Sequence, residues 1–270
     1  MASMGFLQQT ASGGGWRQRL PVSPNRPWSQ SGQVLQTWCT VPAHLEKTLL
    51  RIEPALALDN PGFRPLANGT VIGTLLTHRD ALAALGDAVN LPPYKAPPKA
   101  PVLYIKPRNT HIGHGGAIVV PAGVDALEMG ATLGIVIGET ICRASEADAL
   151  NSVAGYIVCN DVSVPHDSYY RPSLRFKCRD TFLAIGPRIA GARQVADPDA
   201  LSLSVMIDGA IVQRSSTAGV QRGVARLIAE VSEFMTLSPG DVLMLGVPAG
   251  APRARAGQHV SITIEGVDTL

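Results

Sequence analysis

The pattern of apolar and polar positions predicts many strands and few helices. Two-residue alternation runs through 201–213 around Asp208-Gly209, a dipeptide that favours a tight hairpin turn. Apolar residues recur at helical spacing in 78–89 and 219–236, and Ser145 is a good N-cap for a helix to about residue 154. The remaining apolar runs have strand length: 69–76, 102–106, 117–121, 132–138, 155–163, 241–246 and 259–266. We therefore expect an α+β, mainly β fold rather than a doubly wound parallel sheet.

Composition divides the chain into three expected parts. Residues 1–45 contain all three tryptophans and no acidic residue, and we expect a disordered extension there, although basic, Ser-rich leaders are also typical of transit peptides. Residues 46–100 are expected to form a small strand and helix unit with a Pro-rich strap, because five prolines lie between Pro92 and Pro101. Residues 101–270 carry the regular strand pattern of the main domain.

Charge and cysteine content exclude several classes of protein. The net charge is +2 and there is no dense Lys/Arg stripe, so nucleic acid is not an expected partner. No apolar run reaches the length of a membrane span, and no membrane contact is expected. No Cys-x-x-Cys pair is present, which favours a reducing compartment such as the cytoplasm. The Gly-x-Ser-x-Gly elbow, the P-loop and Gly-x-Gly-x-x-Gly are also missing.

Asp161 is the first candidate for chemistry because it ends an almost wholly apolar strand. A carboxylate buried there needs a cation, a metal ion or several N–H donors to offset desolvation. An Asx-turn that caps the strand end is the simpler alternative. His166 follows five residues later and is a candidate acid or base.

A cluster of cations follows. Arg171, Arg175, Lys177 and Arg179 lie within nine residues, and in an extended segment these odd positions share one face. Because apolar neighbours interrupt the cluster, it is either a solvated basic face or a half-buried pocket that suits a dianionic small molecule.

Two glycine-rich segments are the remaining candidates. The loop Gly246-Val247-Pro248 follows an apolar strand, and it is either a plain turn or a place where backbone N–H groups approach an anion. His111 and His114 lie in a second such segment, which predicts a surface loop or a loop that gates a substrate.

Four stretches together resemble the fumarylacetoacetate hydrolase family, in order and spacing, over about residues 67–270. They are LGIVIGETICRAS (133–145), GYIVCNDVS (155–163), KCRDTFLAIGP (177–187) and SPGDVLMLGVPAG (238–250). KPRNT (106–110) and SYYRPSLRFKCRD (168–180) carry a finer likeness, to the amino-terminal half of isomerase/decarboxylases of homoprotocatechuate (4-hydroxyphenylacetate) breakdown. The resemblance implies a mixed β-roll or sandwich with few helices. It also implies isomerisation of 2-hydroxyhepta-2,4-diene-1,7-dioate, decarboxylation of 5-oxopent-3-ene-1,2,5-tricarboxylate, or both.

The resemblance also implies site residues. In the family, a Glu-x-Glu pair and a later Asp hold Mg²⁺ or Mn²⁺, but here the pair falls on Gly130 and Thr132, and only Asp161 matches. No metal ligand set is therefore predicted. The expected catalytic residues are Lys177, which matches the family lysine, Asp161 and His166. The expected substrate-binding residues are Arg171, Arg175, Gly246, Val247 and Pro248.

The implied ligand is a small dianionic or trianionic keto or enol acid. A homodimer is expected, or a heterodimer with a homologous chain that carries the metal. Two alternatives stay open: a non-catalytic partner subunit of that chain, and a hydrolase of the acylpyruvate or fumarylacetoacetate type.

Overall fold

The computed structural model describes residues 69–169 and 174–270, all within one compact unit. The predicted extension 1–45, the first part of the predicted unit 46–100, and Arg171 lie outside the described residues. The domain boundaries therefore stay a prediction. Within the described part, the strand at 71–75 pairs with strands from both 102–106 and 242–244.

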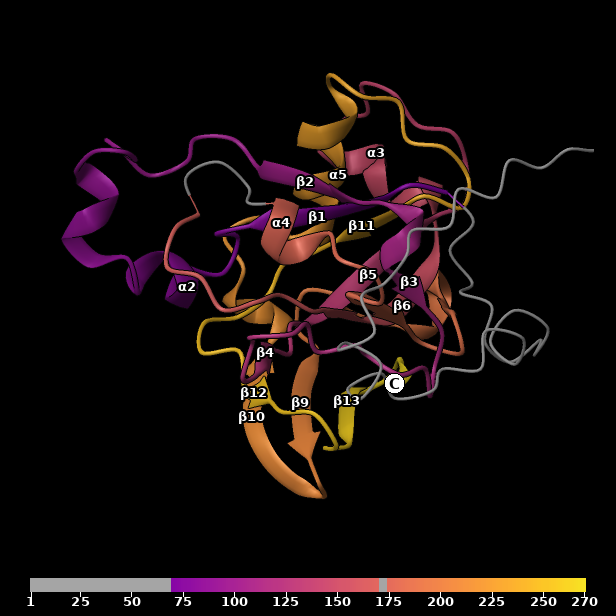
Figure 1. Cartoon of the computed structure of the whole chain (residues 1–270). Coiled ribbons are helices and arrows are strands. Elements are labelled where there is room, and N and C mark those ends of the chain that lie inside the picture. Colours follow the sequence, from indigo (N-terminus) through magenta and orange to yellow (C-terminus); the bar gives the residue numbers. More distant parts are fainter. Residues whose placement is uncertain (1–68, 170–173) are drawn as a thin grey trace, which may run out of the picture. The chain divides into compact units, whose positions relative to one another are not determined.

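A mixed main sheet forms the centre of the fold (Figure 1). Strands β1 and β11 run parallel, as do β3 and β7, and the other neighbours are antiparallel. In spatial order the strands are β2 (Val102–Lys106), β1 (Val71–Leu75), β11 (Val242–Met244), β5 (Ala131–Ile137), β6 (Val153–Asp161), β7 (Leu183–Ile185) and β3 (His111–Ile112), with β8 (Ala190–Gly191) also paired to β6.

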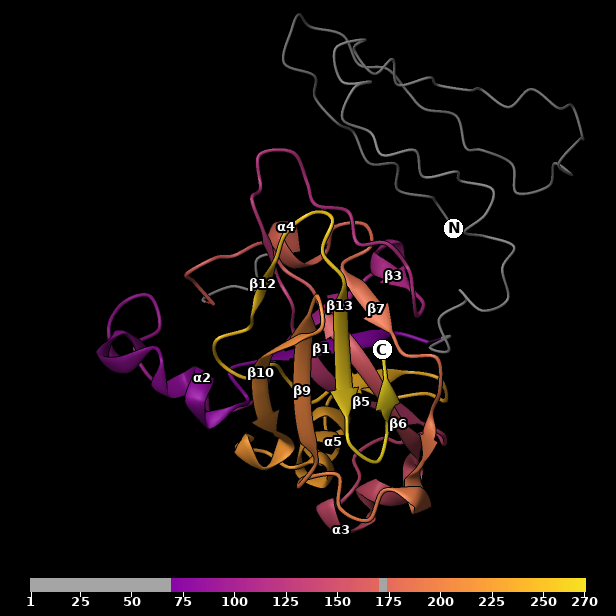
Figure 2. The same cartoon turned by 90° about the horizontal axis from the view of Figure 1, so that it is seen from below.

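A second sheet packs against one face of the first (Figure 2). Its order is β10 (Ala210–Ser216), β9 (Ser202–Ile207), β13 (Val260–Ile264) and β14 (Asp268–Thr269). A separate two-stranded ladder joins β12 (Arg253–Ala254) to β4 (Leu127–Glu128). This small ladder contributes to the site described below.

The central strands are buried on both faces, which explains their continuous apolar runs. Leu133 and Ile135 of β5 share one apolar cluster with Leu203 and Val205 of the second sheet. Val136, which follows Ile135 and points to the opposite face of β5, belongs to a second cluster that includes Val242 and Met244. The core is thus two-sided, with the main sheet in the middle.

The helices are short. They are α2 (Arg79–Ala83), α3 (Glu146–Ala149), α4 (Leu174–Lys177) and α5 (Val224–Ser232). The 3₁₀ turns are η3 (Gly86–Asn90), η4 (Arg108–Thr110), η5 (Leu150–Ser152), η6 (Ala192–Gln194) and η7 (Thr217–Gly219). Across 69–169 and 174–270, none of the helices has both the length and the apolar character that crossing a bilayer requires. The cytoplasmic location stays a prediction.

The mainly β, α+β fold predicted from the sequence is confirmed. The hairpin is confirmed as well, since Asp208 and Gly209 both have positive φ and join β9 to β10. Ser145 caps α3 by accepting the Asp148 backbone N–H, but the helix ends at Ala149 instead of about residue 154, because a 3₁₀ turn follows and β6 begins at Val153. The buried face predicted for the helix in 219–236 is found on α5, although that helix begins only at Val224.

Three further local predictions are wrong. Residues 117–121 form no strand, because no neighbouring strand pairs with them; Val119 instead donates its N–H to the Thr181 hydroxyl. The helix expected over 78–89 ends at Ala83, and Gly86, with φ +50°, begins a 3₁₀ turn. The cation cluster is not extended, because Leu174–Lys177 form a helical turn.

Candidate functional site

A cavity of about 560 Å³ lies beside the end of β6. Its wall includes apolar side chains from β1, from the segment between α2 and η3 and from the loop after β11, among them Leu75, Leu85 and Val247. The ionisable side chains on its wall are Glu128, Asp161, Asp167, Lys177, Arg253 and His166, together with Tyr169. This combination of an apolar wall and a few convergent polar groups is typical of a small-molecule site.

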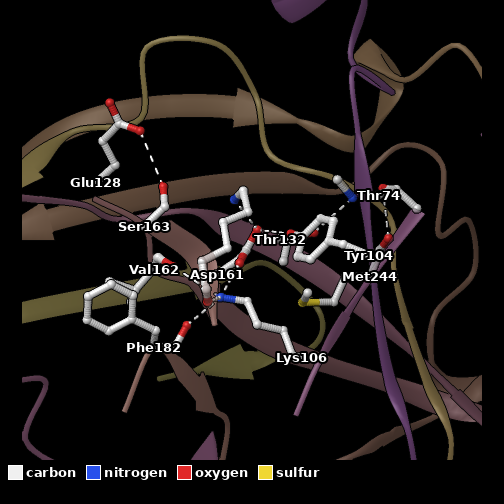
Figure 3. Close-up of polar contacts among 12 residues, drawn as sticks. Thr74, Tyr104, Lys106, Glu128, Thr132, Asp161, Val162, Ser163, Phe182 and Met244 are labelled. Atoms are coloured by element: carbon white, nitrogen blue, oxygen red, sulfur yellow. Dashed lines mark hydrogen bonds and ion pairs between the residues drawn. The ribbon is translucent and has the colours of Figure 1, made fainter. Parts of the chain in front are cut away.

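Asp161 is held at the floor of the cavity by two ammonium groups and a phenol (Figure 3). Its Oδ1 lies 2.7 Å from Lys106 Nζ, and its Oδ2 accepts a hydrogen bond from Lys177 Nζ at 2.9 Å. The Tyr104 hydroxyl also donates to Oδ2. All four side chains are buried. The cation that the sequence required for Asp161 is therefore supplied twice.

Lys106 holds the backbone around Asp161 in place. Besides Asp161, its ammonium donates to the backbone carbonyls of Val162, Lys177 and Phe182, at 3.1, 2.6 and 2.8 Å (Figure 3). These three carbonyls account for the three N–H donors of a protonated amine, and the 2.7 Å contact with Asp161 Oδ1 is an ion pair. The side chain has no exposed area. Lys106 thus links β2 to the end of β6, to α4 and to the segment before β7.

The charges of this cluster add up to a positive site. Burial alone raises the pKa of Asp161, but the ammonium groups of Lys106 and Lys177 outweigh burial and hold that pKa well below its usual range. Burial and the neighbouring Asp161 raise the pKa of Tyr104, so the phenol stays protonated. Burial lowers the pKa of Lys106, and the neighbouring Asp161 carboxylate opposes that shift. With both lysines protonated, one carboxylate between two ammonium groups leaves a net charge of +1, and only Lys177 of the two lysines lines the cavity.

His166 lies on the same cavity wall, between two aromatic rings. Its ring stacks on Phe176, with centroids 5.1 Å apart, and is tilted against Tyr169 at 5.6 Å. Its Nδ1 lies 2.9 Å from the carbonyl of Val164, a contact that requires a proton on Nδ1. In the neutral ring, Nε2 then carries the free lone pair, which is the state of a proton acceptor.

Three buried threonines hold the loop that follows β11. Thr74 and Thr77 donate their hydroxyl protons to the carbonyls of Met244 and Leu245, at 3.0 and 2.8 Å. Thr132 Oγ1 accepts the N–H of Gly246 at 3.0 Å. This N–H is therefore already paired with the protein, whereas Val247 and Pro248 line the cavity.

We expect Gly246→Ala to be clearly destabilising. Gly246 has φ +122°, and an added Cβ would lie 1.7 Å from Thr77 Oγ1. Gly257→Ala is the matched control, because φ is also positive there (+87°) but nothing lies within 4 Å of an added Cβ. The free energy of unfolding should fall by about 1–2 kcal/mol in the control. In Gly246→Ala it should fall by at least about 2 kcal/mol more, measured by urea unfolding. Equal losses would contradict the steric role of the Thr77 contact.

The structure gathers some of the predicted site residues and separates others. Asp161, His166, Lys177, Val247 and Pro248 line one cavity, with Gly246 buried directly behind. Arg175 does not line that cavity: its side chain is exposed, with the guanidinium 4.5 Å above the Phe176 ring. The short helix α4 is the reason, because neighbouring odd positions on a helix point in different directions. Arg171 lies outside the described residues.

Other residues of the site were not predicted as functional. Lys106 and Tyr104 come from β2, some 55 residues before Asp161, and only the presence of Lys106 in the KPRNT stretch hinted at them. His111, of the predicted surface or gating loop, begins β3 and contacts the Lys106 carbonyl at 3.0 Å through Nε2. His114 is exposed in the turn that follows.

The residues present do not fit a divalent cation. A Cβ on Gly130 would lie 2.4 Å from the Asp161 carbonyl oxygen, so that position has no room for a carboxylate side chain in this backbone. The Thr132 hydroxyl oxygen already accepts the Gly246 N–H, and the Asp161 carboxylate is already paired with two lysines. In the described part of the chain, no three His, Cys, Asp or Glu side chains come together as metal ligands would.

The chain is similar to curated proteins of aromatic catabolism. It is 41% identical over 202 residues to the 4-hydroxyphenylacetate degradation bifunctional isomerase/decarboxylase of Escherichia coli, a match that covers 75% of this chain and 46% of that protein. The homoprotocatechuate catabolism bifunctional isomerase/decarboxylase of Escherichia coli is 40% identical over the same length. The chain thus spans about half the length of these relatives.

Solved structures and a family model agree with these relatives. A 5-carboxymethyl-2-hydroxymuconate delta-isomerase from Mycobacterium smegmatis has a TM-score of 0.63 at 32% identity, covering 76% of this chain and 78% of that one. A 2-hydroxyhepta-2,4-diene-1,7-dioate isomerase from Mycobacterium marinum has a TM-score of 0.61 at 30% identity, covering 76% and 73%. The model of the fumarylacetoacetate (FAA) hydrolase C-terminal domain matches residues 70–270. The chain therefore belongs to the fumarylacetoacetate hydrolase family.

Proposed function

We propose that the chain isomerises 2-hydroxyhepta-2,4-diene-1,7-dioate in 4-hydroxyphenylacetate catabolism, and that it does so with lysine in place of a divalent cation. The observation that carries the proposal is the position of Lys177, whose ammonium lies on the cavity wall within a cluster of net charge +1. The names of the similar isomerases and isomerase/decarboxylases support the choice of substrate.

The chemistry of this isomerisation matches the groups available. The reaction removes the proton from the 2-hydroxyl and adds one to a carbon of the diene, giving a 2-oxo acid with one C=C bond. Negative charge develops on the 2-oxygen in the intervening dienolate, where a fixed ammonium stabilises it. In our proposal Lys177 supplies this stabilisation, and Asp161, held ionised, keeps the Lys177 side chain in position.

His166 is the proposed proton carrier. With Nδ1 directed at the Val164 carbonyl, Nε2 is the nitrogen that accepts the hydroxyl proton and returns it to carbon. Asp161 suits this role less than the sequence suggested, because its lowered pKa makes it a very weak base near neutral pH.

Decarboxylation of 5-oxopent-3-ene-1,2,5-tricarboxylate is the second candidate activity. It also passes through an enolate, but it needs a stronger electron sink than proton transfer does, and an ammonium polarises a 2-oxo acid less than a chelated dication. We therefore expect isomerisation to exceed decarboxylation in this chain. A hydrolase of the acylpyruvate type, which normally activates water with a metal, fits these residues least.

Activity in the presence of a chelator tests the proposal. We expect the purified chain, treated with EDTA and desalted, to convert the dienol at the rate of the untreated protein. The rate is measured from the loss of the dienol absorbance. Added Mg²⁺ or Mn²⁺ should leave that rate unchanged. Loss of activity with EDTA and its return with either ion would contradict the proposed role of lysine.

Mixing experiments separate the proposal from the partner-subunit alternative. The chain is assayed alone and together with a homologous chain that keeps the Glu-x-Glu pair. Activity of the chain alone supports our proposal, whereas activity that needs the second chain and disappears with EDTA supports a non-catalytic partner. The homodimer, like the heterodimer, stays a prediction that sedimentation of the same samples measures.

A further inference from the structure

Three backbone segments carry a row of polar side chains along the wall of the cavity. Arg253 of β12 lies directly opposite Glu128 of β4 in an antiparallel pair. Glu128 lies opposite Ser163 on its other side, where the backbones exchange hydrogen bonds of 2.9 and 3.2 Å. Directly opposed residues project from the same face of a ladder, and all three residues line the cavity.

The row begins where the Asp161 cluster ends. Ser163 is two residues after Asp161, and Figure 3 shows Glu128 above Ser163 on the side away from Lys106. Burial falls along the same direction. Side-chain exposure is 1% at Asp161 and 7% at Lys177, but 21% at Glu128 and 61% at Arg253. The cavity therefore has a buried cation at its inner end and a second cation near solvent.

The contacts of Arg253 leave it able to change partner. Its guanidinium lies 3.4 Å from Glu128 Oε1, while Ser163 Oγ lies 3.4 Å from Glu128 Oε2. Both distances are long for charge-assisted hydrogen bonds, and solvent screens an ion pair at this exposure. A ligand carboxylate that offers the guanidinium two well-placed oxygens would replace the Glu128 contact at little loss.

We propose that Arg253 binds the distal carboxylate of an α,ω-dicarboxylic 2-hydroxy or 2-oxo acid, and that Glu128 holds this arginine when the ligand is absent. This inference rests on the proposed function for the orientation of the ligand, with its 2-oxygen at Lys177. Leu75, Leu85 and Val247 on the cavity wall suit the carbon chain between the two charged ends. Arg253 would then select diacids over monoacids.

Kinetics with paired substrates test this assignment. The pair is 2-hydroxyhepta-2,4-diene-1,7-dioate and the monoacid 2-hydroxypenta-2,4-dienoate, which lacks the distal carboxylate. For Arg253→Gln we expect KM for the diacid to rise about tenfold to a hundredfold, the range of a lost charged hydrogen bond, with little change in kcat or in either constant for the monoacid. Arg255→Gln is the matched control, because Arg255 is an exposed arginine two residues later and outside the cavity wall.

Glu128→Gln gives an effect of the opposite sign. Removing the competing carboxylate should lower KM for the diacid, and the double variant should behave like Arg253→Gln alone. A pair with a merely structural role would raise KM in both single variants, or would affect diacid and monoacid equally, and either result overturns the proposal.

Calorimetry separates this inference from the proposed reaction. The unreactive acids 2-oxoheptanedioate and 2-oxohexanoate are titrated into the wild-type chain, Arg253→Gln and Arg255→Gln. If the wild type turns nothing over but binds the diacid more tightly, and only Arg253→Gln removes that preference, the isomerase proposal fails and the role of Arg253 stands. Equal binding of the two acids by the wild type, or no binding of either, overturns the role of Arg253.

Discussion

Lys106→Met is expected to lower the free energy of unfolding by about 3–5 kcal/mol, the usual result of removing one partner from a buried ion pair. The substitution removes a cation from Asp161 and one hydrogen-bond donor from each of three buried carbonyls. Urea unfolding of the whole chain measures the loss. Arg108→Met, an exposed cation two residues later, is the control and should stay within about 0.5 kcal/mol of the wild type.

The dependence on pH shows whether the loss comes from the ion pair. The folded-state pKa of Asp161 is below its unfolded value, so the stabilising effect is present above about pH 4 and is lost as pH falls further. The difference between wild type and Lys106→Met should therefore narrow below about pH 4. If the variant does not fold, Tyr104→Phe removes one hydrogen bond from the same carboxylate and should cost about 1.5–3 kcal/mol. A Lys106→Met protein as stable as the control would contradict our description of the cluster.

Lys177→Met is expected to reduce turnover of the dienol by about 10²–10³-fold, the range found when one donor to a developing oxyanion is removed. Its effect on stability should be smaller than that of Lys106→Met, because Lys106 and Tyr104 still hold Asp161. Arg179→Met is the control, since Arg179 lies two residues away and is exposed. Initial rates and urea unfolding are measured on the same preparations. Unchanged turnover in a folded Lys177→Met protein would exclude Lys177 as the oxyanion donor.

Much of the fold was predictable because buried strands and hairpin turns leave local patterns. The apolar run of β5 and the Asp208-Gly209 turn depend on residues close in sequence. The strand predicted over 117–121 does not form, for a reason that no local pattern reveals: a strand also needs a neighbouring strand with which to pair.

The site was predictable only in part for the same reason. The requirement for a cation at Asp161 followed from desolvation, but the identity of Lys106 depends on how β2 is placed across the main sheet from β6. The direction of Arg175 depends on a single helical turn of four residues, too short to leave a periodic signal. Glu128 and Arg253 face each other across a two-residue ladder, which the sequence alone does not bring together.

The Lys106 ammonium also restricts the evolutionary routes open to this site. A glutamate introduced at Gly130 would collide with the Asp161 backbone, and Asp161 would still be neutralised by two lysines. Removing Lys106 first would take a donor from three buried carbonyls, of which that of Phe182 keeps the Val162 N–H as a second donor. Each single step toward a carboxylate metal site therefore passes through a less stable protein, and reaching one requires several substitutions together.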